Sequence, residues 1–135
     1  MSCENLNGHE FQNHVADILR ENYGVVRTEK YIGTKDNGIR YRADVVLTEQ
    51  MIIVECKIKN TTGTVEEKIL DKAMHMQHMI DITSHKRGVI IYGGIKWNLV
   101  QMRYLETKIP KLFPSVSMIR YEDDTELKNI WVKNI

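Results

Sequence analysis

Two carboxylates and one amine stand at the edges of two hydrophobic runs in the middle of the chain. Asp44 precedes the run at residues 45–47, while Glu55 and Lys57 follow the run at residues 51–54. Carboxylate oxygens are hard ligands that favour Mg²⁺ or Mn²⁺ over zinc. A metal between two carboxylates can produce a hydroxide nucleophile, and an amine nearby can orient or deprotonate the attacking water. These residue types therefore suit metal-assisted hydrolysis of a phosphate ester.

Two neighbouring strands must position these groups, and their register can be tested against the side chains because strand residues alternate between two faces. We pair Leu47 with Ile52 across a connection at residues 48–51. This register builds one apolar face, on which Val45 faces Val54 and Ala43 faces Cys56. A slip by one residue would set Asp44 against Val54 and mix polar with apolar side chains on both faces.

The same register places the charged residues together on the opposite face. Asp44 then lies across from Glu55, and directly opposed residues have Cβ atoms about 4.5–5.5 Å apart. Two carboxylates at that separation repel each other and can hold one divalent cation between them. Lys57 points to the same face, with Arg42 opposite. The alternative is that these charges only end the strands and pair with Arg42, Lys57 and Lys59, but the match of three positions favours a metal site.

The rest of the chain alternates helical and strand patterns around this hairpin. A first helix begins at the capping box of Asn7 and Glu10 and ends at Gly24, and a second begins at the capping box of Thr64 and Glu67 and runs to about residue 83. We expect strands at 25–32, 88–92 and 117–121, and a third helix at 97–108 that ends before Pro110. This order predicts an α/β fold with an αβββαβ core, a mixed central sheet flanked by helices, and an added C-terminal helix and strand.

Composition limits the class of protein. The 135 residues suit one domain over residues 1–135, with 42% hydrophobic and 27% charged residues. Cys3 and Cys56 are too far apart for a Cys-x-x-Cys metal pair, and no apolar run approaches the ~18 residues of a membrane span, so we expect a cytoplasmic protein without a membrane partner. Because the net charge is only +1, any nucleic-acid surface must be local, and basic residues are concentrated in the middle third.

The central residues and the order of elements resemble the PD-(D/E)xK, or restriction endonuclease-like, nuclease superfamily. Asp44 matches its strand aspartate and Glu55-Cys56-Lys57 matches its Glu-x-Lys, within about residues 8–93. Ala43 stands where the family name has proline. The resemblance implies catalysis by Asp44, Glu55 and Lys57 with Mg²⁺ or Mn²⁺, and the backbone carbonyl of Cys56 as a further ligand. It also implies an acidic residue on the first helix, for which Glu10 is the candidate; the capping box is the equally good alternative.

Several polar residues are candidates for DNA contact or for support of the site. Glycine at a helix N-terminus lets the backbone approach a phosphate, so Gly63 and Thr64 could bind one, although an ordinary capped loop explains them too. Gln77 could support the site from the second helix or be a satisfied half-buried amide. The candidate DNA contacts also include the cations Arg40, Arg42, Lys59, Lys68 and Lys72.

The resemblance implies a Mg²⁺-dependent DNA endonuclease, either restriction-type or structure-specific in the manner of a resolvase or repair enzyme. So compact a nuclease needs help to cut both strands, so we expect a homodimer or a subunit of a larger nuclease complex. The alternative is a non-catalytic DNA-binding or assembly subunit that retains the nuclease fold. The presence of Asp44, Glu55 and Lys57 argues against that alternative, because an inactive descendant has no chemical need for them.

Overall fold

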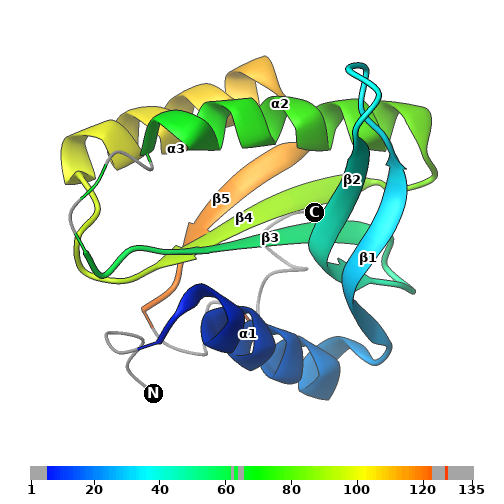
Figure 1. The fold of residues 1–135 in the computed structure, drawn as a ribbon, viewed down its shortest axis with the longest axis horizontal. Helices are drawn as coiled ribbons and strands as arrows, with labels where there is room; N and C mark the ends of the chain where they lie inside the picture. Colours follow the sequence, from blue (N-terminus) through cyan, green and yellow to red (C-terminus); the bar gives the residue numbers. More distant parts are fainter. Residues whose placement is uncertain (1–5, 62, 64–65, 123–126, 128–135) are drawn as a thin grey trace.

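The computed structural model describes residues 6–61, 63, 66–122 and 127. Eight elements follow one another along the chain (Figure 1): α1 (Gly8–Tyr23), β1 (Val26–Thr34), β2 (Arg40–Leu47), β3 (Ile52–Ile58), α2 (Glu66–Ile82), β4 (Arg87–Gly93), α3 (Leu99–Leu112) and β5 (Val116–Arg120). The predicted αβββαβ core and the added helix and strand are therefore confirmed.

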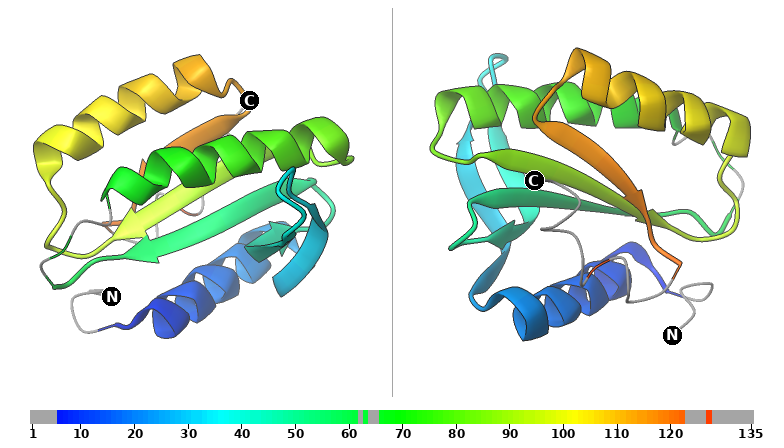
Figure 2. Two further views of the ribbon diagram at one scale, coloured as in Figure 1. Left: turned by 45° about the horizontal axis from the view of Figure 1, so that its top comes forward. Right: turned by 180° about the vertical axis from the view of Figure 1, so that it is seen from behind.

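The five strands form one mixed sheet in the order β1-β2-β3-β4-β5. β1, β2 and β3 are antiparallel neighbours, whereas β3, β4 and β5 run parallel. Parallel neighbours need a crossover, and α2 and α3 supply the two crossovers on one face of the sheet. α1 covers the opposite face (Figures 1 and 2).

Each face of the sheet has its own apolar core. On the α1 side, Phe11, Val15 and Leu19 pack against β2, β3 and β4. On the α2–α3 side, Ile69 and Met76 are fully buried against the same strands. The predicted start and end of α1 are confirmed as well. Asn7 Oδ1 accepts a hydrogen bond from the Glu10 N–H at 2.8 Å, and Gly24 ends the helix with a φ of +82°.

The predicted hairpin register is confirmed at three pairs: Val45 with Val54, Val46 with Ile53, and Leu47 with Ile52. The β2–β3 ladder then ends at Val45. Ala43 does not join the face of Cys56: Ala43 belongs to the core under α2, whereas Cys56 belongs to the core over α1. The prediction of an apolar face that extends to these two residues is therefore wrong.

A bend in the β1–β2 ribbon explains this difference. Glu29, between the pairs Thr28–Val45 and Lys30–Ala43, has a φ of +51°, which a non-glycine residue rarely adopts. Beyond that point the ribbon lies beside α2 (Figure 1), and a Cβ on Gly33 would stand 2.9 Å from Met79 Sδ. The bend therefore brings the first residues of β2 toward α2 and opens β2 away from β3.

The third helix differs from its prediction at both ends. Trp97 precedes α3, and its indole N–H donates to the Gly93 carbonyl at 2.6 Å; Asn98 is the N-cap. α3 continues through Pro110 to Leu112. A proline in the last turn removes only one of the final intrahelical hydrogen bonds, so the helix tolerates it there. In the part of the chain that the structure describes, none of the helices has the length and apolar content to span a membrane.

Candidate active site

Asp44 and Glu55 meet where β2 and β3 separate. Asp44 Oδ2 accepts a hydrogen bond from the Cys56 N–H at 2.9 Å, so a side chain takes over where the β2–β3 ladder has ended. Glu55 is 1% exposed and lies on the face of β3 that α2 covers. The bend in the ribbon thus creates room for two carboxylates beside each other at the end of a paired hairpin.

Two donors contact the same oxygen of Glu55. The Tyr41 hydroxyl donates to Oε1 at 2.6 Å, and Lys72 Nζ lies 3.4 Å from that oxygen. Lys72 also lies over the Tyr41 ring, with Nζ 4.6 Å from the ring centroid. Burial, and next the charge of Asp44, raises the pKa of Glu55 to about 8 in spite of Lys72. Burial raises the pKa of Tyr41 as well, so this hydroxyl remains a donor.

This donor set fits a hard divalent cation. The raised pKa of Glu55 reflects first its burial and next the charge of the half-buried Asp44 carboxylate beside it, and a divalent cation would compensate the negative charge of both groups. Among the described residues, no three His, Cys, Asp or Glu side chains come together as a metal-binding group. Mg²⁺ commonly binds through one or two carboxylates and keeps several water molecules, so two carboxylates are sufficient.

Cys56 presents its side chain to the other face of the sheet. The thiol is buried in the α1-side core, and burial raises its pKa well above the ordinary range. The thiol is therefore not a metal ligand in this arrangement. The proposed role of the Cys56 carbonyl stays a prediction.

Lys57 lines a pocket of about 260 Å³ on the same face as Glu55. Within the part of the chain that the structure describes, its ammonium has no hydrogen-bond or ion-pair partner, and the same holds for the ammonium groups of Lys35 and Lys68. Their positive charge makes the pocket suitable for an anion such as a phosphate. The full lining is Lys35, Tyr41, Lys57, Lys68, Ile69, Asp71, Lys72 and His75.

Glu10 lies apart from this group. Its Oε1 accepts a hydrogen bond from the Asn7 N–H at 3.1 Å, which completes the capping box. The apolar stripe of α1 packs on the face of the sheet opposite to Glu55. The structure therefore gives Glu10 the capping role and does not bring it to Asp44 and Glu55.

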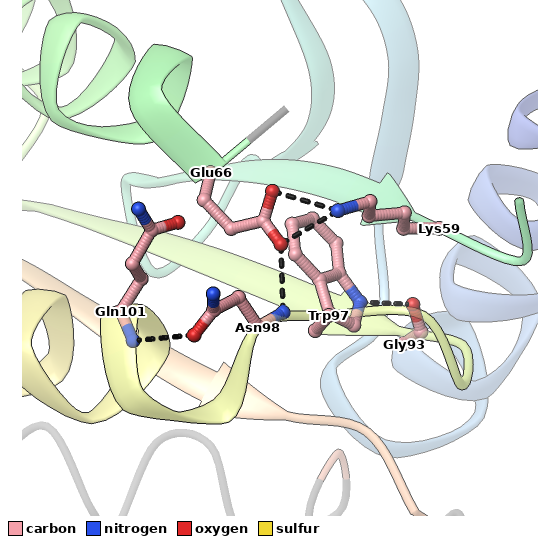
Figure 3. A network of polar contacts seen from close by, with 6 residues as sticks. All are labelled: Lys59, Glu66, Gly93, Trp97, Asn98 and Gln101. Atoms are coloured by element: carbon pink, nitrogen blue, oxygen red, sulfur yellow. Dashed lines mark hydrogen bonds and ion pairs between the residues drawn. The ribbon is translucent and has the colours of Figure 1, made fainter. Parts of the chain in front are cut away.

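The prediction that Lys59 contacts DNA does not agree with its position, because the side chain is buried, at 7% exposure. Its ammonium contacts both oxygens of Glu66, at 2.7 and 2.6 Å, and Glu66 also accepts the Asn98 N–H at 2.7 Å (Figure 3). Burial alone would raise the pKa of Glu66, but the hydrogen bonds from Lys59 and Asn98 outweigh it and lower the pKa. One buried carboxylate thus ties the end of β3 to the starts of α2 and α3.

Of the two alternatives for Gln77, support of the site or a satisfied amide, the structure favours the satisfied amide. Its Nε2 donates to Asp81 at 2.9 Å, and its Oε1 accepts the Ser115 N–H at 2.9 Å, where α2 meets the start of β5. Both ends of the amide are therefore occupied away from Glu55, so Gln77 does not support the site.

The remaining candidates divide by position. Arg40 and Arg42 are exposed on β2, and the Arg40 guanidinium lies 3.8 Å from the centroid of the Tyr31 ring. Gly63 is exposed beside Glu66, in a second pocket of about 330 Å³. Thr64 lies outside the described residues. Lys68 and Lys72 line the same pocket as Lys57, and their contact with DNA stays a prediction.

Tyr41 and Lys35 are site residues that sequence reasoning missed. Tyr41 is two residues before Ala43, so regular strand alternation would place both side chains on the same face, the one opposite to Glu55. Only the bend at Glu29 turns it toward α2. The sequence did offer one indication, a tyrosine between two arginines. A buried tyrosine usually finds a hydrogen-bond partner for its hydroxyl.

Comparison with known proteins identifies the family of this chain. A family model described as a PD-(D/E)XK nuclease superfamily domain matches residues 3–130. No curated protein and no solved structure matches the chain.

Proposed function

This chain belongs to the PD-(D/E)XK nuclease superfamily, and we propose that it is a Mg²⁺-dependent endonuclease that hydrolyses phosphodiester bonds in DNA. The observation that carries this proposal is the contact between Asp44 and Glu55 on the face of β3 that also carries Lys57, whose ammonium has no partner among the described residues. The family supplies the reaction class, and these three side chains supply the chemistry that the reaction needs.

Asp44 and Glu55 would hold the cation, with Mn²⁺ as an alternative to Mg²⁺. When bound there, the cation supplies positive charge to the phosphate and lowers the pKa of a water molecule. Lys57 lies two residues beyond Glu55 on the same face of β3, so its amine reaches the same space. It would orient or deprotonate the attacking water and offset the negative charge that develops on the phosphate.

The lysine-lined pocket would receive the phosphates that flank the bond to be cut. Lys35 comes from the β1–β2 turn and Lys68 from α2, so cations from two elements face one space. Arg40 and Arg42 alternate with Tyr41 along β2 and are exposed, so they would add positive charge on the other side of the ribbon. Because the net charge of the chain is only +1, affinity for DNA would depend on this local surface and fall with added salt.

Two biological roles fit such an enzyme, restriction-type cleavage and the cleavage of branched DNA by a resolvase or repair nuclease. Restriction-type cleavage and the resolution of a junction require cuts in two strands, and one copy of this site cuts one strand at a time. We therefore propose that the chain acts as a homodimer or within a larger nuclease complex.

The proposal is tested by incubation of the protein with supercoiled plasmid, a four-way junction and a flap substrate in Mg²⁺, Mn²⁺ or EDTA. Asp44→Asn and Lys57→Met are the test variants. Asparagine keeps an acceptor for the Cys56 N–H, so this variant removes the charge and leaves the hairpin bond. Lys86→Met is the matched control, because Lys86 is exposed and lines a different pocket, beside Ser115.

We expect metal-dependent cleavage by the wild type and by Lys86→Met, and its loss in both test variants. The preferred substrate would then decide between the two roles. Cleavage that survives Asp44→Asn and Lys57→Met would refute this site. DNA binding without cleavage, equal in Mg²⁺ and EDTA, would instead favour the non-catalytic subunit.

A further inference from the structure

We propose that Tyr41 is a positioning residue of the metal site: its hydroxyl holds one oxygen of Glu55, so that the other oxygen is presented to the cation. This inference rests on the proposed function, since it takes Asp44 and Glu55 as the metal ligands. It adds a residue that lies outside the Asp and Glu-x-Lys motif, and it names the bond through which that residue acts.

The contacts of Glu55 divide sharply between its two oxygens. Oε1 accepts the Tyr41 hydroxyl at 2.6 Å and lies 3.4 Å from Lys72 Nζ. Among the described residues, the N–H and hydroxyl donors that contact Glu55 all do so at Oε1, and the remaining contact of this carboxyl is with the carboxyl of Asp44. Contacts at Oε1 restrict the rotation of the Glu55 carboxylate, so that its second oxygen can face a cation between Glu55 and Asp44.

Tyr41 is itself fixed firmly enough to do this. It is 2% exposed and belongs to the core that contains Ile69 and Ala73 of α2. Lys72, on the same helix, covers the ring at 4.6 Å. The ring therefore cannot rotate freely, and the position of α2 determines where the hydroxyl lies.

Loss of this hydroxyl should weaken metal binding measurably. Groups that orient a metal ligand typically contribute about 10–100-fold in affinity or activity. We expect Tyr41→Phe to bind Mn²⁺ about tenfold more weakly, since Lys72 still contacts Glu55 Oε1 in this variant. Phenylalanine keeps the ring that packs against α2, so the core is preserved.

The test measures Mn²⁺ binding by electron paramagnetic resonance, without DNA, for the wild type, Tyr41→Phe and Tyr92→Phe. Tyr92 is the matched control because it is also 2% exposed, lies in the same core, and donates its hydroxyl to a carboxylate, that of Glu106. Thermal unfolding in EDTA checks the fold of each variant. Cleavage is then followed against Mn²⁺ concentration: for Tyr41→Phe we expect a higher half-saturating concentration and recovery of the rate at saturation.

The outcomes separate this inference from the proposed function. Mn²⁺ binding weakened in Tyr41→Phe alone supports the positioning role. If the wild type binds Mn²⁺ and the affinity of Tyr41→Phe is within about twofold of the wild-type affinity, the inference is overturned and the metal site is unaffected. Equal weakening in Tyr92→Phe would also overturn it, because the effect would then come from the core in general. A wild type that binds no Mn²⁺ would refute the metal site, and the inference with it.

Discussion

Replacement of Glu55 by glutamine should make the metal-free protein more stable, and increasingly so as the pH rises. Burial, followed by the charge of Asp44, raises the pKa of Glu55 from 4.5 to about 8. Between these two values the folded protein holds a proton that the unfolded chain has released. The free energy of unfolding therefore falls as the pH rises through this interval, and the contribution of this group to stability is largest below it.

The size of the effect follows from one proton. The slope is at most about 1.4 kcal/mol per pH unit, so across the interval from 4.5 to about 8 the effect is on the order of 5 kcal/mol. Glutamine resembles the protonated acid: its Oε1 can accept the Tyr41 hydroxyl, and its amide can donate toward Asp44. The stability difference between Glu55→Gln and the wild type should grow up to about pH 8 and then level off.

Urea unfolding in EDTA at a series of pH values measures this difference. Glu21→Gln, at an exposed position on α1, is the control for the removal of one surface charge. Mn²⁺ at pH 8 should stabilise the wild type and leave Glu55→Gln unchanged, because the cation binds the ionised carboxylate. A difference between the two proteins that does not vary with pH would refute the account of Glu55 as a buried and repelled carboxylate.

Two further predictions concern the connections that hold β3 in place. Gly94→Ala should destabilise the fold by more than about 2 kcal/mol, because Gly94 has a φ of +102° and a Cβ there would lie 2.4 Å from the Lys59 carbonyl oxygen. Gly38→Ala, with a φ of +85° and open space, should cost only about 1 kcal/mol; equal losses would contradict the steric argument. Glu66→Gln should cost about 3 kcal/mol in urea unfolding, because the buried charge of Lys59 loses its counter-charge, and an unchanged midpoint would show that water reaches this ammonium.

Local signals in the sequence predicted the frame of the site well. The capping box at Asn7 and the alternation around Val45 and Val54 depend on residues close in sequence, and both are present in the structure. The same register predicted that Asp44 lies across from Glu55. The two carboxylates do contact each other, but they do so beyond Val45–Val54, the last pair of the β2–β3 ladder.

What could not be predicted depends on contacts between distant segments. Lys59 has the sequence context of a surface lysine, and its burial is due to Glu66, which reaches it only once α2 packs over the end of β3. Gln77 has a helical position that faces inward, but its partner Ser115 comes from beyond α3. The bend at Glu29, which moves Tyr41 to Glu55, has no glycine to mark it.

The network around Glu66 also has a consequence for how the sequence can change over evolutionary time. A single substitution at position 59 or 66 leaves a buried charge without a partner, and this is strongly disfavoured. Replacement of both residues by apolar ones removes the charges together, yet it still leaves the Asn98 N–H without its acceptor. Positions 59 and 66 are therefore expected to covary among descendants of a common ancestor, and position 66 to retain an oxygen wherever the start of α3 is kept. Such covariation would record a contact between β3 and α2 that no pattern within either segment reveals.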